Sequence, residues 1–179
     1  MPGDSVKKVL FVAFSLCVVC SILVSTSAVK LRPIQEANKR LDLKKNLLLA
    51  TGLVDSNASS EEIKSVFTSK IETLVVDVKT GMKVSNMDAT SFDQRKAAGN
   101  PKLNEVISSD IDIAKIKYRS KYSLVYLVKE NGNVDQIVLP IKGKGLWSTL
   151  YGFLALGTDT KTIKGIGFYE HGETAGLGG

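Results

Sequence analysis

The stretch that decides the fold is YSLVYLVKENGNVDQIVLPI, residues 122–141. Its two halves are rich in the β-branched and aromatic residues that favour strands, and Asn131-Gly132 separates them. Asn-Gly accepts the two positive φ angles of a type I′ turn, so the stretch predicts a β-hairpin. The first strand is apolar on both faces, which predicts a central strand that is covered on both sides. One face carries Tyr122, Leu124, Tyr126 and Val128, and the other carries Val125 and Leu127.

Helices are expected before the hairpin. Pro33 suits the first turn of a helix, and apolar residues follow it at helical spacing up to Gly52, a natural C-terminal stop. We expect this helix to continue directly from the apolar segment that precedes it. Ser59 stands three residues before Glu62, as in a capping box, which predicts a second helix over 60–69.

Further strands are expected on both sides of the hairpin. Residues 71–78 are enriched in β-branched side chains and precede Thr80-Gly81, which predicts a strand and a turn. The polar segment 82–120 predicts loop with helical pieces. Long-range strand pairing, together with helices placed early in the chain, predicts an α+β domain with an antiparallel sheet.

An uncharged apolar segment of 21 residues, 9–29, lies near the N-terminus. At about 1.5 Å per residue this length crosses a hydrocarbon core of about 30 Å, which predicts a single transmembrane helix. A cleaved signal peptide is the alternative, because Lys7-Lys8 would serve as its basic region and residues 25–28 are small. The predicted division is a tail over 1–8, a transmembrane helix over 9–29 and a domain over 30–179.

The charges around this segment do not settle its orientation. Two lysines precede it and six basic residues follow it within 30–45, so a literal count keeps the C-terminal side in the cytoplasm. Long domains translocate largely regardless of such counts.

The composition excludes several classes of protein. The chain has 179 residues, a net charge of +6, 44% hydrophobic residues and 23% charged residues, which is too apolar for a disordered tail. Two cysteines cannot build a disulfide-rich scaffold. A mild basic excess with few aromatic residues does not indicate nucleic-acid binding, and no metal-ligand pattern is present.

The C-terminal segment is the most informative for chemistry. Glycines at 172, 176, 178 and 179 permit close backbone approach to a ligand, and His171, Glu173 and Thr174 place hydrogen-bonding groups among them. The segment is therefore either an ordinary turn or a ligand-binding loop. Neither GxGxxG nor GxxxxGK[ST] occurs in the sequence, so dinucleotide and P-loop sites are not predicted.

Two aromatic side chains near this segment also have two interpretations each. Trp147 is suited to stacking on an aromatic cofactor ring, and equally to anchoring the core. His171 is the only histidine, and a lone loop histidine is more often a polar surface residue than a catalytic one.

Several blocks in a fixed order after one apolar span carry a resemblance to a known family. They are QEANKRLDLKKNLLLATGL, FDQRKAAGNP, YLVKENG, GKGLWSTLYGFLAL and FYEHGETAGLGG. Together they closely resemble the C subunits of the bacterial sodium-translocating NADH:quinone oxidoreductases. The G subunits of the Rnf electron-transport complexes share the flavin domain, but the GLWS and FYEHGET blocks are more similar to the sodium pump.

The resemblance implies an extracytoplasmic domain that carries covalently attached FMN. In the family the EHGET-x-GLG loop lies against the flavin, which assigns five residues of this loop to cofactor contact, with Trp147 as a nearby candidate. The five are Glu173, Thr174, Gly176, Leu177 and Gly178. No catalytic residue and no metal ligand is assigned. This chain has Ala175 where the family usually has proline, which frees one φ angle without removing a ligand.

The family's attachment threonine is in a Ser-Gly-Ala-Thr type motif, which the resemblance places beyond Gly179. No such motif occurs in this sequence, so we expect an FMN domain that lacks its C-terminal part and does not hold flavin covalently.

The resemblance also implies function and location. It implies an electron-carrying protein, not active alone, that relays single electrons within a six-subunit sodium-pumping NADH:ubiquinone reductase. The protein would cross the bacterial inner membrane once, contact its lipid, and place its domain in the periplasm. The alternative is a membrane-anchored binding or assembly module without redox activity.

Overall fold

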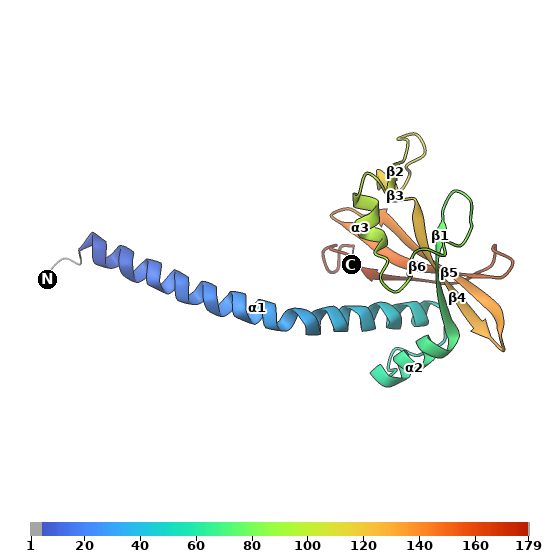
Figure 1. Cartoon of the computed structure of the whole chain (residues 1–179), viewed down its shortest axis with the longest axis horizontal. Helices are drawn as coiled ribbons and strands as arrows, with labels where there is room; N and C mark the ends of the chain where they lie inside the picture. The colour runs from blue at the N-terminus through green and yellow to red at the C-terminus, as the bar shows by residue number, and fades with distance from the viewer. Residues whose placement is uncertain (1–4, 179) are drawn as a thin grey trace. The chain divides into compact units, whose positions relative to one another are not determined.

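The structure, a computed structural model, describes residues 5–178. Helix α1, Val6–Ala50, runs without interruption through the apolar segment and beyond it, which confirms the expected continuation (Figure 1). Pro33 lies in the interior of this helix, so its predicted first-turn position is wrong. A proline there removes one main-chain hydrogen bond, a loss that a helix of 45 residues tolerates.

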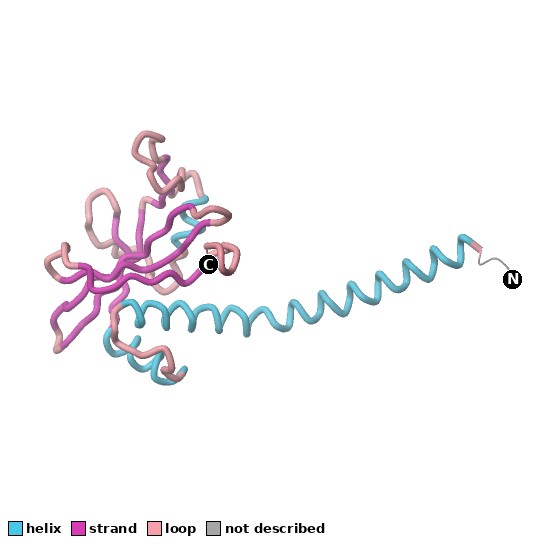
Figure 2. Tube along the Cα trace, turned by 180° about the vertical axis from the view of Figure 1, so that it is seen from behind, coloured by secondary structure: helices cyan, strands magenta, loops and turns pink. Residues whose placement is uncertain are grey.

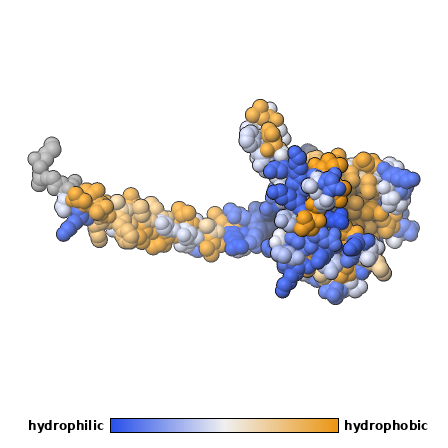
Figure 3. Space-filling view, turned by 90° about the horizontal axis from the view of Figure 1, so that it is seen from above, coloured by the Kyte–Doolittle hydropathy of each residue, from blue (hydrophilic) through white to orange (hydrophobic). Residues whose placement is uncertain are grey.

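The structure separates into two units, Met1–Arg40 and Leu41–Gly179. Among the described residues α1 is the one helix that is long and apolar enough to cross a membrane, judged by length and composition. Figure 3 shows hydrophobic side chains over the N-terminal part of this helix and hydrophilic ones over its later turns. Residues 1–4 of the predicted tail lie outside the described range.

The second unit is built on a five-stranded antiparallel sheet with the order β1-β4-β5-β6-β7. Figure 2 shows the strands of this unit in magenta. Its strands are β1 Ile71–Asp77, β4 Tyr122–Glu130, β5 Asn133–Lys144, β6 Thr149–Gly157 and β7 Ile163–Glu170. The antiparallel sheet and the early helices confirm the predicted α+β class.

The predicted hairpin is confirmed. Asn131 and Gly132 join β4 to β5 with φ angles of 51° and 82°, as a type I′ turn requires. Strand β4 lies between β1 and β5, and on one face Tyr126 and Val128 are buried. On the other face Val125 and Leu127 remain half-buried, so the expected cover is complete at Tyr126 and Val128 and only partial on this second face.

The covered face holds the core. The C-terminal end of α1 and helix α2, Ser60–Lys70, pack there against β4, β5 and β6. The fully buried side chains of the core cluster on this face are Leu47, Leu48, Val128, Val138, Phe153 and Ala155. Gly52, with a φ of 71°, ends α1 as predicted, and the side chain of Ser59 accepts the N–H of Glu62 to begin α2.

The segment 82–120 is more ordered than expected. It contains helix α3, Gln94–Gly99, and a small antiparallel pair formed by β2, Asn104–Val106, and β3, Tyr118–Ser120. The helix agrees with the predicted helical pieces. The two strands were missed because three residues are too few to show the two-residue period of a strand.

Strand β7 is irregular at two points. Its register against β6 shifts at two positions, and in each case the extra residue is on β7: Lys164 near its start and Tyr169 near its end. Such bulges bend a strand and redirect its side chains. Between them Gly165 lies against the carbonyl of Ala50, where any Cβ atom would clash, so the end of α1 closes directly onto β7.

Candidate functional site

The register of β6 and β7 brings two loops together. Tyr151 near the start of β6 pairs with Glu170 at the end of β7. The loop 145–148 precedes β6 and the loop 171–178 follows β7, so the two loops are neighbours at the same end of these paired strands. All six predicted site residues lie in these two loops.

The carboxylate of Glu173 joins the loops. Its oxygens accept the backbone N–H of Ser148 at 2.9 Å, the hydroxyl of Ser148 at 3.2 Å and the backbone N–H of Trp147 at 3.2 and 3.3 Å. The N–H of Gly172 donates in turn to the Ser148 hydroxyl at 2.6 Å. We call this group of four residues the Glu173 bracket.

The bracket favours an ionised carboxylate. The N–H of Ser148 is the largest influence, and with the N–H of Trp147 it holds the pKa of Glu173 below its ordinary value, although partial desolvation opposes this. Hydrogen bonds to a charged acceptor are stronger than neutral ones. The negative charge of Glu173 therefore holds the two loops together.

Glycines make the close approach possible. A Cβ atom on Gly145 would overlap the Glu173 carboxylate and the side chain of Leu150. A Cβ atom on Gly172 would lie within 3.1 Å of Ser148. Any side chain at 145 would therefore displace the Glu173 carboxylate or Leu150, and one at 172 would crowd Ser148.

The remaining part of the C-terminal loop is a tight turn. The carbonyl of Thr174 accepts the N–H groups of Leu177 at 3.0 Å and Gly178 at 3.1 Å, and Gly176 has a φ of 79°. Within residues 5–178 no group accepts the N–H of Ala175 or Gly176. The turn therefore presents unused backbone donors beside the bracket.

Large apolar side chains of both loops are exposed. Trp147 is 68% exposed, so the expectation that it anchors the core is wrong, and the stacking role remains a prediction. Leu146 and Leu177 are also exposed, at 74% and 80%. Exposed large apolar side chains beside hydrogen-bond donors are typical of a binding surface for an aromatic ligand.

Sequence reasoning missed Ser148 as a site residue. It lies next to Trp147 in the GLWS block, but its role depends on the pairing of β6 with β7, which no local pattern reveals. His171, the lone histidine, is an exposed loop residue. Among residues 5–178 no three His, Cys, Asp or Glu side chains gather in a way that could hold a metal ion.

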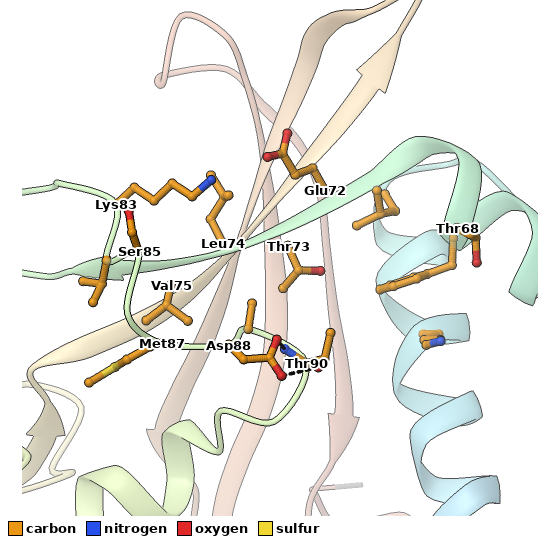
Figure 4. Close-up of a pocket in the computed structure, with 15 residues that line it drawn as sticks. Thr68, Glu72, Thr73, Leu74, Val75, Lys83, Ser85, Met87, Asp88 and Thr90 are labelled. Carbon is orange, nitrogen blue, oxygen red and sulfur yellow. Dashed lines mark hydrogen bonds between the residues drawn. The ribbon is translucent and has the colours of Figure 1, made fainter.

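A separate open groove of about 540 Å³ lies along β1, and none of the predicted site residues lines it. Figure 4 shows this groove between β1, the segment around Met87, and helices α1 and α2. Its two carboxylates already have partners within the structure. Asp88 accepts the Thr90 hydroxyl at 2.6 Å, and Glu72 pairs with Lys129 at 2.6 Å.

The chain is similar to a family model and to several known proteins. The model of a family described as FMN-binding domain matches residues 145–179, the stretch that holds both loops. The C subunit of the Na(+)-translocating NADH-quinone reductase of Pseudomonas aeruginosa is 44% identical over 176 residues, covering 98% of this chain and 67% of that protein. The corresponding C subunit of Haemophilus ducreyi is 45% identical over 177 residues, covering 98% and 67%.

A solved structure supports the same relationship. The crystal structure of Shewanella oneidensis NqrC is 38% identical, with a TM-score of 0.71, covering 78% of this chain and 63% of that chain. The present chain thus spans roughly two thirds of the length of these relatives. High identity over almost its whole length, and the matching fold, show that the chain belongs to the NqrC family, the C subunits of the Na(+)-translocating NADH-quinone reductases.

Proposed function

We propose that this chain is an FMN-carrying electron-transfer subunit of a sodium-translocating NADH:quinone reductase. The observation that carries the proposal is the Glu173 bracket, which joins the loops 145–148 and 171–178 inside the stretch that the FMN-binding domain model matches. Both loops then act as one surface. Its exposed apolar side chains and free backbone donors are the features that a flavin ring needs.

The chemistry of the surface fits FMN. A flavin has a large aromatic ring with hydrogen-bonding atoms along its edges. Trp147 and Leu177 offer apolar faces for the ring, and the hydroxyl of Thr174 and the N–H of Gly176 offer donors for its edge. When bound, FMN supplies the electron-transfer chemistry.

The chain's own residues would bind, orient and shield the ring. Glu173 sets the distance between Trp147 and the Thr174–Gly178 turn through its bonds to the backbone. The N–H groups of Ala175 and Gly176 would be available to hydrogen-bond the ring, and such donors would stabilise added electron density. Leu177 and Trp147 would reduce the contact of the ring with water. No proton transfer by a side chain is required of this surface.

Covalent attachment of FMN is not assigned to any residue here. The family attaches FMN through a threonine in a Ser-Gly-Ala-Thr type motif, and these 179 residues contain none. Residues 145–178 are therefore proposed to contribute contacts and orientation.

We further propose that α1 anchors the protein in the bacterial inner membrane with the domain on the periplasmic side. The uncharged segment 9–29 supports the anchor, and the family resemblance supports the side. The partners are the other subunits of the complex and membrane lipid. The variant Asn133→Cys, at the exposed start of β5, would react with a membrane-impermeant thiol reagent in intact spheroplasts if the domain is outside.

The test uses the complex that contains this chain, with Trp147→Ala, Trp147→Phe and the distant control Arg119→Ala. We expect Trp147→Ala to lower both the FMN content of the complex and its sodium-dependent quinone reduction, and Trp147→Phe to retain most of both. Full FMN content and full rate in Trp147→Ala would contradict the proposed surface. Full sodium-dependent rate in a complex without FMN on this chain would favour the non-redox anchored module.

A further inference from the structure

Arg95 connects helix α3 to the end of β7. Asp93 caps the helix by accepting the N–H groups of Arg95 and Lys96, each at 3.0 Å, which fixes the first turn. From this turn the Arg95 guanidinium donates to the carboxylate of Glu170 at 2.8 Å and to the hydroxyl of Tyr169 at 3.2 Å. These contacts join residues 74 and 75 positions apart in the chain.

Aromatic rings surround the same guanidinium. Its central carbon lies 3.5 Å from the ring centroid of Tyr151 and 5.7 Å from that of Tyr169. Tyr169 stacks on Phe153 with centroids 4.9 Å apart, and Phe153 meets Tyr126 edge to face at 5.8 Å. Arg95 therefore stands at the outer end of a row of rings that begins in the buried core.

The bulge at Tyr169 explains how one guanidinium meets two consecutive residues. In a regular strand Tyr169 and Glu170 would point to opposite faces. Because Tyr169 is the extra residue of the bulge, the alternation is broken at this point and both side chains reach Arg95. The guanidinium is a planar fork with several donors, which suits this double contact.

The bulge directly precedes the candidate site. Glu170 is followed by His171 and by Gly172, whose N–H belongs to the Glu173 bracket. The direction in which the chain leaves β7 therefore sets where the bracket and the turn lie. Bulges commonly redirect a strand beside a functional site.

We propose that Arg95 is a positioning residue: it holds the Tyr169 bulge in place and so fixes the loop 171–178 against the loop 145–148. We call the contacts of Arg95 with Tyr169 and Glu170 the clamp. The part of the inference that concerns FMN binding rests on the proposed function, whereas the clamp itself is a property of the chain without FMN. Arg95 touches neither loop directly and acts through Tyr169 and Glu170.

The first measurement is amide hydrogen exchange on the whole 179-residue chain in detergent, without FMN. The variants are Arg95→Ala, Arg95→Lys and Glu170→Gln, with Arg119→Ala as the matched control, since Arg119 pairs with Glu105 at 3.4 Å on β2 and β3. We expect Arg95→Ala to speed exchange of the Gly172 and Ser148 amides at least tenfold. Exchange in β4 and β5 should stay unchanged.

The variant Arg95→Lys tests whether the geometry of the guanidinium or only its positive charge holds the loop. Lysine retains the charge but lacks the planar fork, so Arg95→Lys should recover little of the lost protection. Glu170→Gln should show part of the Arg95→Ala effect. Equal acceleration over all strands would mean general destabilisation and would overturn the proposal, as would unchanged exchange at Gly172 and Ser148 in Arg95→Ala.

The second measurement is FMN affinity by fluorescence titration of the same chains. We expect Arg95→Ala to weaken FMN binding about tenfold relative to the unsubstituted chain and Arg119→Ala to leave it unchanged. If the unsubstituted chain binds no FMN, the proposal that this chain carries FMN is contradicted. The exchange data would still show whether the clamp holds the two loops together. Normal FMN affinity in Arg95→Ala, with accelerated loop exchange, would contradict the link between the clamp and the cofactor.

Discussion

The carboxylate of Glu173 lies 2.9 Å from the backbone nitrogen of Ser148, although 25 residues separate them in the chain. The side chain thus bonds to the protein's own backbone and ties two loops together. A cofactor placed against these loops would meet a surface whose shape depends on one charged group.

Glu173→Gln is expected to loosen the site without disturbing the sheet. Glutamine keeps one acceptor oxygen but loses the charge that strengthens the bonds to Trp147 and Ser148. FMN affinity should fall several-fold, and further in Glu173→Ala. The measurement is a fluorescence titration with FMN, with Glu130→Gln on the exposed hairpin as control. Identical affinities in Glu173→Gln and Glu130→Gln would remove Glu173 from the binding surface.

The bracket should weaken in acid. The pKa of Glu173 is lower in the folded chain than its ordinary value of 4.5. A lowered pKa contributes stability that is complete above the unfolded value and is lost as the pH falls through the folded pKa. Trp147 is the only tryptophan, so its emission should change with a midpoint below 4.5. The step should be missing in Glu173→Gln, and its persistence there would assign it to another carboxyl group.

Gly145→Ala is expected to destabilise the domain because the new methyl group overlaps Glu173 and Leu150. Because the overlapped atoms are the ends of side chains in a half-buried loop, the loss of unfolding free energy should be about 1 kcal/mol, the lower end of the cost of overpacking. Gly99→Ala is the control, since nothing lies within 4 Å of the added atom. Urea unfolding of both variants measures the difference. Equal stabilities would show that the loop gives way without cost.

Gly132→Ala tests the hairpin that organises the sheet. Gly132 has a φ of 82°, and an alanine held in the left-handed region costs roughly 1–2 kcal/mol. The free energy of unfolding should fall by about that amount relative to Gly99→Ala. A loss much smaller than this would mean that the turn adopts another conformation readily.

Val19→Lys tests the membrane anchor. Val19 is at the middle of the uncharged segment 9–29, where a lysine costs about 2.5–3.5 kcal/mol on insertion. Alkaline extraction of membranes should release much of this variant and little of Leu31→Lys, which lies outside the segment. Retention of Val19→Lys at the level of the unsubstituted chain would argue against a spanning helix over 9–29.

Local chemistry made much of this fold predictable. Asn131-Gly132 predicted the hairpin because few other dipeptides accept two positive φ angles, and Gly52 predicted the end of α1 for a related reason. Ser59 predicted the start of α2 through a bond that spans three residues. In each case the deciding interaction lies within a few residues along the chain.

The parts that were missed depend on distant partners. The contact of Glu173 with Ser148 follows from the pairing of β6 with β7. The contact of Arg95 with Glu170 requires both the bulge and the placement of α3. The glycine-rich loop was therefore recognisable as a candidate site from its composition, while its internal hydrogen bonds were not.

The two extra residues of β7 have a consequence for how this strand can change in evolution. Each bulge absorbs its extra residue locally, because the residues on both sides of it still pair with β6. Loss of Lys164 alone would therefore leave the loop 171–178 on the same side of the sheet. Loss of Tyr169 would also keep the pairing, but it would remove a side chain that Arg95 contacts. Deletions in this strand should therefore be tolerated at Lys164 and rejected at Tyr169.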